Sequence, residues 1–394
     1  MRLPFIPIIL ALLVSILLDY YIWRALRNRL KSRWPATVQL ISAALLNVAL
    51  IVAIALPRRD GSNEVLLTDM WLIFTCMSFF IPKAIWAIFD LISRIGKWRP
   101  LRLLSYFGGL LAVALFAVLW WGALIGRTSL DVEEVTVDIP DLPEAFDGYR
   151  IALFSDLHTG SYGSDTTFVS KVVSTINETH PDIILFTGDI VNRNSHELEP
   201  FVAPLSRLKA PDGVFAILGN HDYGDYTDWP SPQAKAENME VLYRLFPRMG
   251  WKLLRDSTAW ITQRADSLAI IGVENIGDPP FPTYGSLEKA YPNVGDSHTK
   301  ILLSHNPKHW SDSISARENI NIALTLAGHT HAMQMEVANW SPACFRYPLW
   351  GGLYGDPADC QLFVNIGIGV VGFPARLLQA TPSITLITLH RTHN

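Results

Sequence analysis

Charged residues and cysteine are both scarce in this sequence. Asp, Glu, Lys and Arg make up 17% of the 394 residues, whereas 49% are apolar. This balance favours a protein with a lipid-embedded part over an ordinary soluble one. The net charge of −4 comes without a large basic patch, so we expect no nucleic-acid partner. Of the three cysteines, Cys344 and Cys360 lie in the C-terminal part, where they either form a disulfide or stay as free thiols.

The apolar residues are concentrated in the N-terminal third, in segments 3–23, 37–56, 66–92 and 103–125. Each segment is long enough to cross a hydrocarbon core, which takes about 20 residues of helix, so the sequence predicts four transmembrane helices. The first segment ends in aromatic residues, which are typical of a retained helix and not of a signal-peptide cleavage site. Pro82 and Lys83 interrupt the third segment, which predicts a kinked or partly re-entrant span. We expect no chain of intramembrane charges of the kind that transport pathways use.

The basic residues between these segments predict which side of the membrane each loop faces. Two loops are rich in them, with Arg24, Arg27, Arg29, Lys31 and Arg33 in the first and Arg94, Lys97, Arg99 and Arg102 in the second. The other side receives only Arg2, Arg58, Arg59 and Arg127. Because basic loops face the cytoplasm, we expect the C-terminal domain outside it, in the periplasm or at the surface of a bacterium, or in a lumen or the exterior of a eukaryote.

After residue 127 the sequence changes to short apolar runs that alternate with helical segments, the pattern of a layered α/β or α+β domain. We therefore place a transmembrane region at 1–127 and a second domain at 128–394. Five apolar runs of the second domain are predicted strands, at 149–154, 182–186, 214–218, 300–303 and 320–326. Asp, Asn or His residues follow each run. Since strands of a sheet bring their C-terminal ends to one edge, these side chains are expected to converge on one crevice.

The polar residues after the strands form a set of possible metal ligands without cysteine: Asp156, His158, Asp189, Asn220, His305, His329 and His331. Such oxygen and nitrogen ligands suit manganese, iron or zinc, and suit copper(I) or iron–sulfur clusters poorly. Seven ligands are too many for one tetrahedral ion. They fit two divalent ions about 3.5 to 4 Å apart that share a carboxylate, the arrangement used for phosphoester displacement.

The ordered series resembles the motifs of the calcineurin-like metallophosphoesterase family, in particular its membrane-anchored bacterial type. The series consists of Asp156-x-His158, Gly188-Asp189, Gly219-Asn220-His221-Asp222, His305 and Gly328-His329-x-His331. The resemblance covers the second domain only and implies a β-sandwich flanked by helices. It also implies one ion on Asp156, His158, Asp189 and His331, and a second ion on Asp189, Asn220, His305 and His329. Asp189 would bridge the two, and a hydroxide between them would attack phosphorus in line.

His221 resembles the family's catalytic histidine, which protonates the departing alkoxide or holds the phosphate. Asp222 either orients His221 as part of the catalytic machinery or caps its own loop. Asn192 stands where some phosphatases of the superfamily have Asp, and its neutral amide cannot lend a negative charge to His221. The resemblance to protein Ser/Thr phosphatases is therefore weakened.

Two further features of the second domain bear on the site. Gly367 and Gly369 resemble the closing segment of membrane-associated family members, and they either let the backbone approach the metals or only form turns. The aromatic and proline-rich stretches 223–232 and 279–291 are expected to form the rim of the site.

Together these features predict a metal-dependent hydrolase of a phosphomonoester or phosphodiester. The membrane helices favour a lipid-linked or envelope substrate. The alternative is a non-catalytic membrane sensor or transporter whose outer domain binds metal or phosphate. The presence of every expected ligand and of His221 favours the enzyme.

Overall fold

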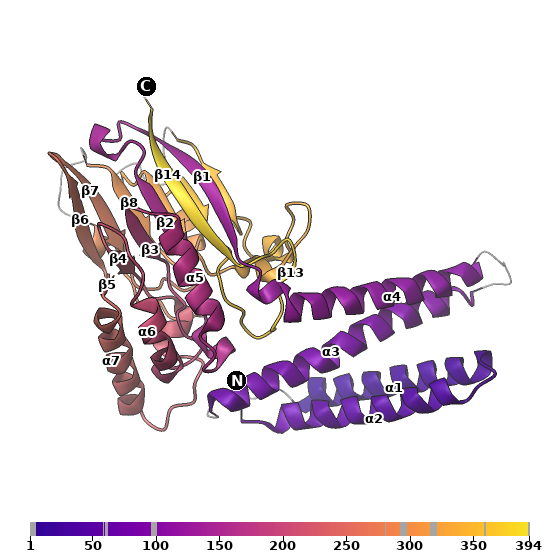
Figure 1. Ribbon diagram of the computed structural model, residues 1–394. Helices are drawn as coiled ribbons and strands as arrows, with labels where there is room; N and C mark the ends of the chain where they lie inside the picture. The colour runs from indigo at the N-terminus through magenta and orange to yellow at the C-terminus, as the bar shows by residue number, and fades with distance from the viewer. Residues whose placement is uncertain are drawn as a thin grey trace. The chain divides into compact units, whose positions relative to one another are not determined.

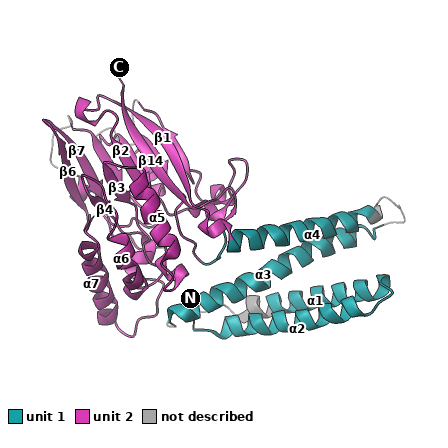
Figure 2. Cartoon of the chain, in the orientation of Figure 1, with its two compact units in different colours: residues 1–124, 372–375 teal, residues 125–371, 376–394 magenta. Residues whose placement is uncertain are grey.

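The structure is a computed structural model that describes residues 5–57, 59, 62–95, 101–279, 281–291, 298–315, 321–357 and 360–392. The chain divides into two compact units (Figure 2). Unit 1 comprises residues 1–124 and 372–375, and unit 2 comprises residues 125–371 and 376–394. No sequence signal separates 372–375 from its neighbours. Among the basic residues that predict the orientation, Arg2, Arg58, Lys97 and Arg99 lie outside the described residues.

Unit 1 consists mainly of long helices (Figure 1). These are α1 (Phe5–Arg29), α2 (Trp34–Ala55), α3 (Asn63–Ile92) and α4 (Leu101–Leu124). Three stretches of the described chain, 34–55, 63–92 and 103–128, are long and apolar enough to cross a membrane, with mean hydropathies of 2.4, 1.8 and 2.2. Since α1 is not among them, the count of four spans stays a prediction.

The third span is one helix, and the prediction that it is partly re-entrant was wrong. Helix α3 continues from Asn63 to Ile92 with Pro82 inside it. A proline removes one backbone hydrogen bond from a helix, but neighbouring helices and local adjustments compensate for such a loss in a membrane-spanning segment.

Unit 2 contains two six-stranded mixed sheets, with strand orders β1-β14-β2-β3-β4-β5 and β11-β12-β9-β8-β7-β6, and a two-stranded sheet of β10 and β13. The strands of the first sheet are β1 (Asp131–Pro140), β2 (Arg150–Phe154), β3 (Ile183–Phe186), β4 (Val214–Ala216), β5 (Trp251–Leu253) and β14 (Ser383–Thr392). Those of the second are β6 (Ser257–Gln263), β7 (Asp266–Gly272), β8 (Lys300–Leu303), β9 (Leu324–Ala327), β11 (Gly352–Gly355) and β12 (Gln361–Val364). The remaining pair is β10 (Met335–Glu336) and β13 (Leu377–Leu378). Helices α5 (Thr167–Glu178), α6 (Val202–Leu205), α7 (Pro232–Arg248), α8 (Leu287–Ala290) and α9 (Lys308–Ser313) complete the domain.

The two large sheets share one core, and helices cover their outer faces. Side chains of a strand alternate between its faces, so Ile151 and Leu153 of β2 join Leu303 of β8 in the core between the sheets. Phe154 of the same strand points the other way and packs with Val172 of α5 in a second core. The predicted α/β domain is therefore present, but the strands that precede the predicted ligands belong to both sheets, β2, β3 and β4 to one and β8 and β9 to the other.

The three cysteines form no disulfide with one another. Cys76 and Cys360 are buried, and Cys344 is partly exposed. The disulfide alternative for Cys344 and Cys360 was therefore wrong.

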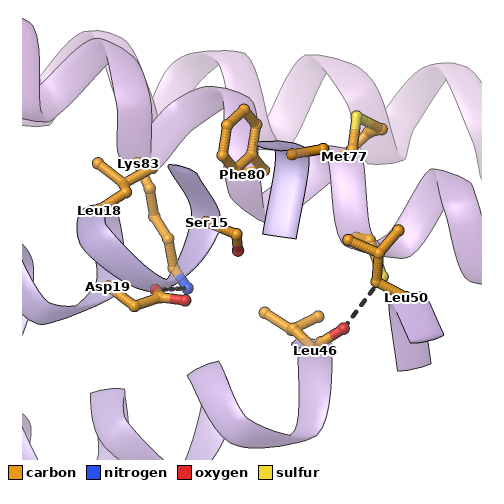
Figure 3. A pocket seen from close by; sticks show the side chains of 10 residues that line it. Ser15, Leu18, Asp19, Leu46, Leu50, Met77, Phe80 and Lys83 are labelled. Carbon is orange, nitrogen blue, oxygen red and sulfur yellow. Dashed lines mark hydrogen bonds and ion pairs between the residues drawn. The ribbon is translucent and has the colours of Figure 1, made fainter. Parts of the chain in front are cut away.

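Unit 1 contains a buried ion pair whose partners are 64 positions apart. Lys83 Nζ of α3 lies 2.8 Å from Asp19 Oδ1 of α1 (Figure 3). The same carboxylate accepts hydrogen bonds from Gln39 Nε2 at 2.8 Å and from Asn47 Nδ2 at 3.3 Å. A cavity of about 70 Å³ lies beside the pair and is also lined by Ser15. Periodicity alone did not reveal that these charges meet.

Removing one partner of this pair is expected to destabilise unit 1. Lys83→Met leaves the Asp19 charge without a cation, and breaking a buried pair costs about 3–5 kcal/mol. The double variant Asp19→Asn/Lys83→Met removes both charges and keeps an acceptor for Gln39 and Asn47, so it should recover much of the loss. Thermal unfolding of the full chain in detergent measures both. The exposed Lys31→Met is the matched control, and equal unfolding temperatures for Lys83→Met and Lys31→Met would contradict the pair.

Candidate metal centre

The predicted ligands follow the C-terminal ends of β2, β3, β4, β8 and β9, and the structure brings them together. Their donor atoms form two groups in which all atoms lie within 4.8 Å of one another: Asp156, His158 and His331 in one, and Asp189, His305 and His329 in the other. Five of these six residues are buried, and His329 is partly exposed.

Asp189 lies between the two groups. Its Oδ2 is 3.6 Å from His158 Nε2 and 3.3 Å from His305 Nε2. In the first group, His331 Nε2 is 3.0 Å from His158 Nε2. Beside the second, Asn220 Oδ1 is 3.2 Å from His305 Nε2. One carboxylate oxygen therefore faces histidines of both groups, as a bridging ligand requires.

Hydrogen bonds at the far side of two rings aim the other ring nitrogen at the cluster. His305 Nδ1 lies 2.7 Å from the Thr187 carbonyl oxygen, which leaves Nε2 as the donor atom. His329 is turned the other way, because its Nε2 lies 2.8 Å from the Tyr347 hydroxyl and its Nδ1 lies 3.2 Å from His305 Nε2. Such outer partners fix the orientation of metal-binding imidazoles. Tyr347 carries no sequence signal that could have identified it.

The backbone at the centre is in a conformation that side chains rarely adopt. Five of the predicted ligands have positive φ: Asp156 (52°), His158 (48°), Asp189 (60°), His329 (77°) and His331 (51°). Left-handed backbone in residues other than glycine costs of order 1–3 kcal/mol each and clusters at functional sites. The surrounding structure must therefore hold these residues in place.

Gly367 and Gly369 allow the backbone to pack closely against Asp156. A Cβ at Gly367, whose φ is +81°, would lie 2.7 Å from Asp156 Cβ. The Gly369 N–H donates to the Asp156 carbonyl oxygen at 2.7 Å. Of the two interpretations left open by the sequence, backbone approach to the site fits these distances and a turn alone does not.

The buried Arg376 side chain hydrogen-bonds to the backbone of the segment that contains Gly367 and Gly369. It is 1% exposed, and its Nε and Nη2 donate to the Gly369 carbonyl oxygen at 3.0 and 2.6 Å. Its Nη1 donates to the Ile366 carbonyl oxygen at 2.9 Å, and its Nη2 lies 3.2 Å from His331 Nδ1. Burial lowers the pKa of Arg376 to about 10, so the side chain is charged at neutral pH.

The charges of the donor groups suit cations. Burial favours the neutral acids, but the His331 imidazole lowers the pKa of Asp156 and the His305 imidazole lowers that of Asp189, so both carboxylates are ionised. Burial lowers the pKa of His329 to about 3, which keeps this ring neutral and able to bind a metal. Although burial acts in the opposite sense, the Asp189 carboxylate raises the pKa of His305 to about 9.

This donor set fits a pair of divalent ions. Two ionised carboxylates, an amide oxygen and imidazole nitrogens converge without a thiolate, which matches manganese, iron or zinc. His305 would give up its proton on binding, as metal ligands do.

His221 lies beside the cluster with its side chain oriented by backbone. Its Nδ1 lies 2.7 Å from the Asn192 carbonyl oxygen, so Nδ1–H donates there and Nε2 is free. The ring stacks on Tyr226 at 4.2 Å and meets the His158 ring edge to face at 4.8 Å. The backbone carbonyl of Asn192 orients His221, so the neutral side chain at this position does not prevent the orientation of His221. The side-chain amide of Asn192 donates to Ser161 Oγ at 3.0 Å.

Of the two roles that the sequence left open for Asp222, orienting His221 and capping a loop, its hydrogen bonds fit the second. Its carboxylate is fully buried and accepts the backbone N–H groups of Asp189, Ile190, Val191 and Gly219 at 2.8 to 3.1 Å. These bonds join the loop after β3 to the loop after β4, so the role of Asp222 is to hold ligands in position.

A pocket of about 210 Å³ opens beside the cluster. Asn220, His221 and His329 face it from the cluster, and Tyr226 and Phe281 come from the two predicted rim segments. Pro280 of the second rim segment lies outside the described residues. The sequence interpretation missed Asn275, Asp278, Asn306 and Tyr347, which also line the pocket.

Asp222→Asn is expected to unfold the centre, because an amide nitrogen cannot accept hydrogen bonds. The N–H groups on one side of the side chain lose their acceptor, and each unsatisfied buried group costs about 1–3 kcal/mol. Thermal unfolding and metal content of the full chain measure the effect. Asp165→Asn, at an exposed carboxylate that accepts from Thr167 N at 2.9 Å, is the control. Unchanged stability and metal content with a lower kcat would instead support a catalytic Asp222.

Known proteins are similar to both parts of the chain. Residues 149–333 match the family described as calcineurin-like phosphoesterase, and residues 1–127 match the one described as probable calcineurin-like phosphoesterase, transmembrane domain. The uncharacterized metallophosphoesterase YkuE of Bacillus subtilis is 30% identical over 298 residues, which cover 73% of this chain and 96% of that protein.

Animal proteins are similar to the chain as well. The transmembrane protein with metallophosphoesterase domain of Danio rerio is 27% identical over 332 residues, 80% of this chain and 72% of that protein. Its namesake of Bos taurus is 28% identical over 297 residues, 74% of this chain and 64% of that protein. The chain therefore belongs to the calcineurin-like metallophosphoesterases, hydrolases that act on phosphoester bonds, and it carries a transmembrane region.

Proposed function

We propose that unit 2 hydrolyses a phosphomonoester or phosphodiester with two divalent ions, manganese, iron or zinc, bound side by side. The proposed ligands of one ion are Asp156, His158, Asp189 and His331, and those of the other are Asp189, Asn220, His305 and His329. The observation that carries the proposal is the position of Asp189 Oδ2, 3.6 Å from His158 Nε2 and 3.3 Å from His305 Nε2. When bound, such ions offset charge on phosphoryl oxygens and make water nucleophilic near neutral pH.

The protein's part in this reaction is to hold its donors rigid. Thr187 and Tyr347 fix the ring orientations of His305 and His329, and the Asp222 carboxylate holds the backbone of Asp189. A site that needs no rearrangement when charge develops stabilises the transition state most strongly.

His221 is the proposed proton donor. Because its Nδ1–H is engaged by the Asn192 carbonyl oxygen, a proton on Nε2 can be delivered to the oxygen of the departing group. Tyr226 stacks on the ring and limits its rotation. General acids of this kind contribute about 10²–10⁴-fold to the rate.

The pocket is proposed to bind the group esterified to the phosphate. Tyr226 and Phe281 offer aromatic faces, whereas Asn275 and Asn306 offer polar ones. Arg346 donates to the lining residue Asp278 at 3.3 Å, which offsets the negative charge that would otherwise repel an anionic substrate.

A lipid-linked or envelope ester is the proposed substrate class. The chain carries more apolar helix than a single anchor requires, which favours chemistry at a membrane surface. The catalytic domain is proposed to lie outside the cytoplasm, because the basic residues gather in the loops after the first and third apolar segments.

Hydrolysis by the full chain in detergent tests the proposed centre. After metal removal and addition of manganese, a chromogenic phosphodiester, a phosphomonoester and a phospholipid in mixed micelles are offered. Asp189→Asn should abolish turnover and the binding of at least one ion, because it removes the shared charge. His221→Ala should lower kcat by about 10²–10⁴-fold with both ions retained.

The exposed His196, whose side chain is 77% exposed, provides the matched control His196→Ala, which should behave like the unmodified chain. Full activity of Asp189→Asn would contradict the shared carboxylate. Two bound ions without turnover of any ester would favour a sensor that binds metal or phosphate.

The proposed orientation has its own test. A periplasmic alkaline phosphatase fused after Asn394 should be active in a bacterial host, and a fluorescent protein that matures only in the cytoplasm should stay dark at the same position. Fusions in the loop after α1, at Leu30, should give the reverse result. A fluorescent C-terminal fusion would place the catalytic domain in the cytoplasm instead.

A further inference from the structure

Unit 1 carries an apolar groove of about 330 Å³ that plays no part in the metal centre. Its walls come from three helices and include Ile22 and Leu26 of α1, Phe79 and Trp86 of α3, and Gly109 and Phe116 of α4. Because α3 and α4 contain stretches apolar and long enough to cross a membrane, the groove is expected to face hydrocarbon chains.

A positively charged cluster lies at one end of the same three helices. The Asp90 carboxylate of α3 is fully buried and accepts from Arg29 Nη2 at 2.5 Å and Arg94 Nη2 at 2.9 Å. It also accepts from the hydroxyls of Tyr21 and Ser105, both at 2.6 Å. The arginine side chains are 42% and 48% exposed. Two guanidinium groups share one carboxylate, so the cluster has a net positive charge with accessible donors.

The groove and the cluster are continuous. On α3, Asp90 follows Trp86 by one turn, and on α4, Gly109 follows Ser105 by one turn, so each polar residue lies next to a groove residue on the same helix face. The Arg29 guanidinium lies 6.0 Å from the centre of the Trp86 ring. The surface thus has cationic donors at one end and an apolar channel leading away from them, which is the complement of a phospholipid.

We propose that unit 1 binds an anionic phospholipid, with its phosphate on Arg29 and Arg94 and one acyl chain in the groove. Guanidinium groups match phosphate oxygens through paired hydrogen bonds, and basic pockets between membrane helices are suited to anionic headgroups. Asp90 holds the two guanidinium groups close together and leaves part of each exposed to a ligand.

This lipid is a ligand of the helices and not a substrate of the metal centre. The groove and cluster residues all belong to unit 1, and the ligand set of the metal centre belongs to unit 2. The proposal therefore does not depend on which ester the enzyme hydrolyses.

Native mass spectrometry of the full chain in a neutral detergent tests the site. Phosphatidylglycerol and phosphatidylcholine with the same acyl chains are added in turn, and the fraction of chain carrying one lipid is measured. Phosphatidylglycerol should bind more tightly, by about five-fold for each arginine that contacts the phosphate. Arg94→Gln should remove about five-fold of that preference, whereas Arg27→Gln, whose guanidinium lies over Trp23, should leave it unchanged.

A second pair of variants tests the groove independently of charge. A Cβ at Gly109 would lie 3.5 Å from Trp86 Cδ1, an ordinary contact, so Gly109→Ala should fit and bind lipid as before. Gly109→Leu extends the side chain into the groove and should remove the bound lipid, with the unfolding temperature in lipid-free detergent showing that the helices remain folded.

Several results would overturn the proposal. Equal binding of the two lipids, or unaltered binding by both Arg94→Gln and Gly109→Leu, would exclude the assigned site. Full displacement of the lipid by glycerol 3-phosphate would reduce the site to an anion site without a chain. A dimer that carries no lipid would assign the groove to a second copy of the chain.

Discussion

Four backbone N–H groups from two separate loops point at one carboxylate, that of Asp222. Three of them belong to residues 189–191 and the fourth to Gly219, so the bonds tie the loop that carries Asp189 to the loop that carries Asn220. Burial raises the pKa of Asp222 to about 7, so the magnitude for an ordinary hydrogen bond applies, about 0.5–1.5 kcal/mol each. Four such bonds offset the cost of one left-handed residue, about 1–3 kcal/mol, and Asp189 can therefore be held at φ 60°.

Hydrogen bonds also offset the cost of left-handed backbone in the first group of ligands. Asp156 and His158 follow β2 and are also left-handed, at φ 52° and 48°. Asp156 is supported by the N–H of His329, which donates to its carboxylate at 3.0 Å, and by the Gly369 N–H, which donates to its carbonyl oxygen. The N–H of His158 donates to the Asp189 carbonyl oxygen at 3.1 Å. Asp and His occur in left-handed backbone more often than most residues other than glycine. The residue types that bind metals are thus also types that tolerate the turns these loops require.

These supports explain which parts of the molecule the sequence could predict. The strands and the residues that follow them are local features, because each apolar run ends directly at a polar motif. Predicted strands lie within a few residues of β2, β3, β4, β8 and β9. The contacts that hold the centre are not local. Ser155 Oγ, for example, bonds with Asn365 across 210 positions, and nothing in either neighbourhood indicates the partner.

The division of the predicted strands between two sheets is also a non-local feature that the sequence does not indicate. An apolar strand with both faces covered has the same composition in either sheet, since β2, β3, β8 and β9 are all buried along most of their length. The role of Asp222 stayed open for a related reason. A carboxylate next to a catalytic histidine in sequence is expected to act on it. Here the carboxylate binds backbone amides of the earlier loop at residues 189–191, and nothing near Asp222 in the sequence indicates these partners.

In unit 1, the net charge of each cluster of charged residues matches its exposure to solvent. Asp19 and Lys83 form a pair of zero net charge, and both side chains are at most 15% exposed, which is tolerable between apolar helices because neither charge is left alone. Asp90 has two cationic partners, and both of these are more than 40% exposed. An excess charge cannot be buried in hydrocarbon, so it has to lie where water or an anionic group can reach it. The surplus arginine therefore belongs at the ends of the helices, where the chain places it.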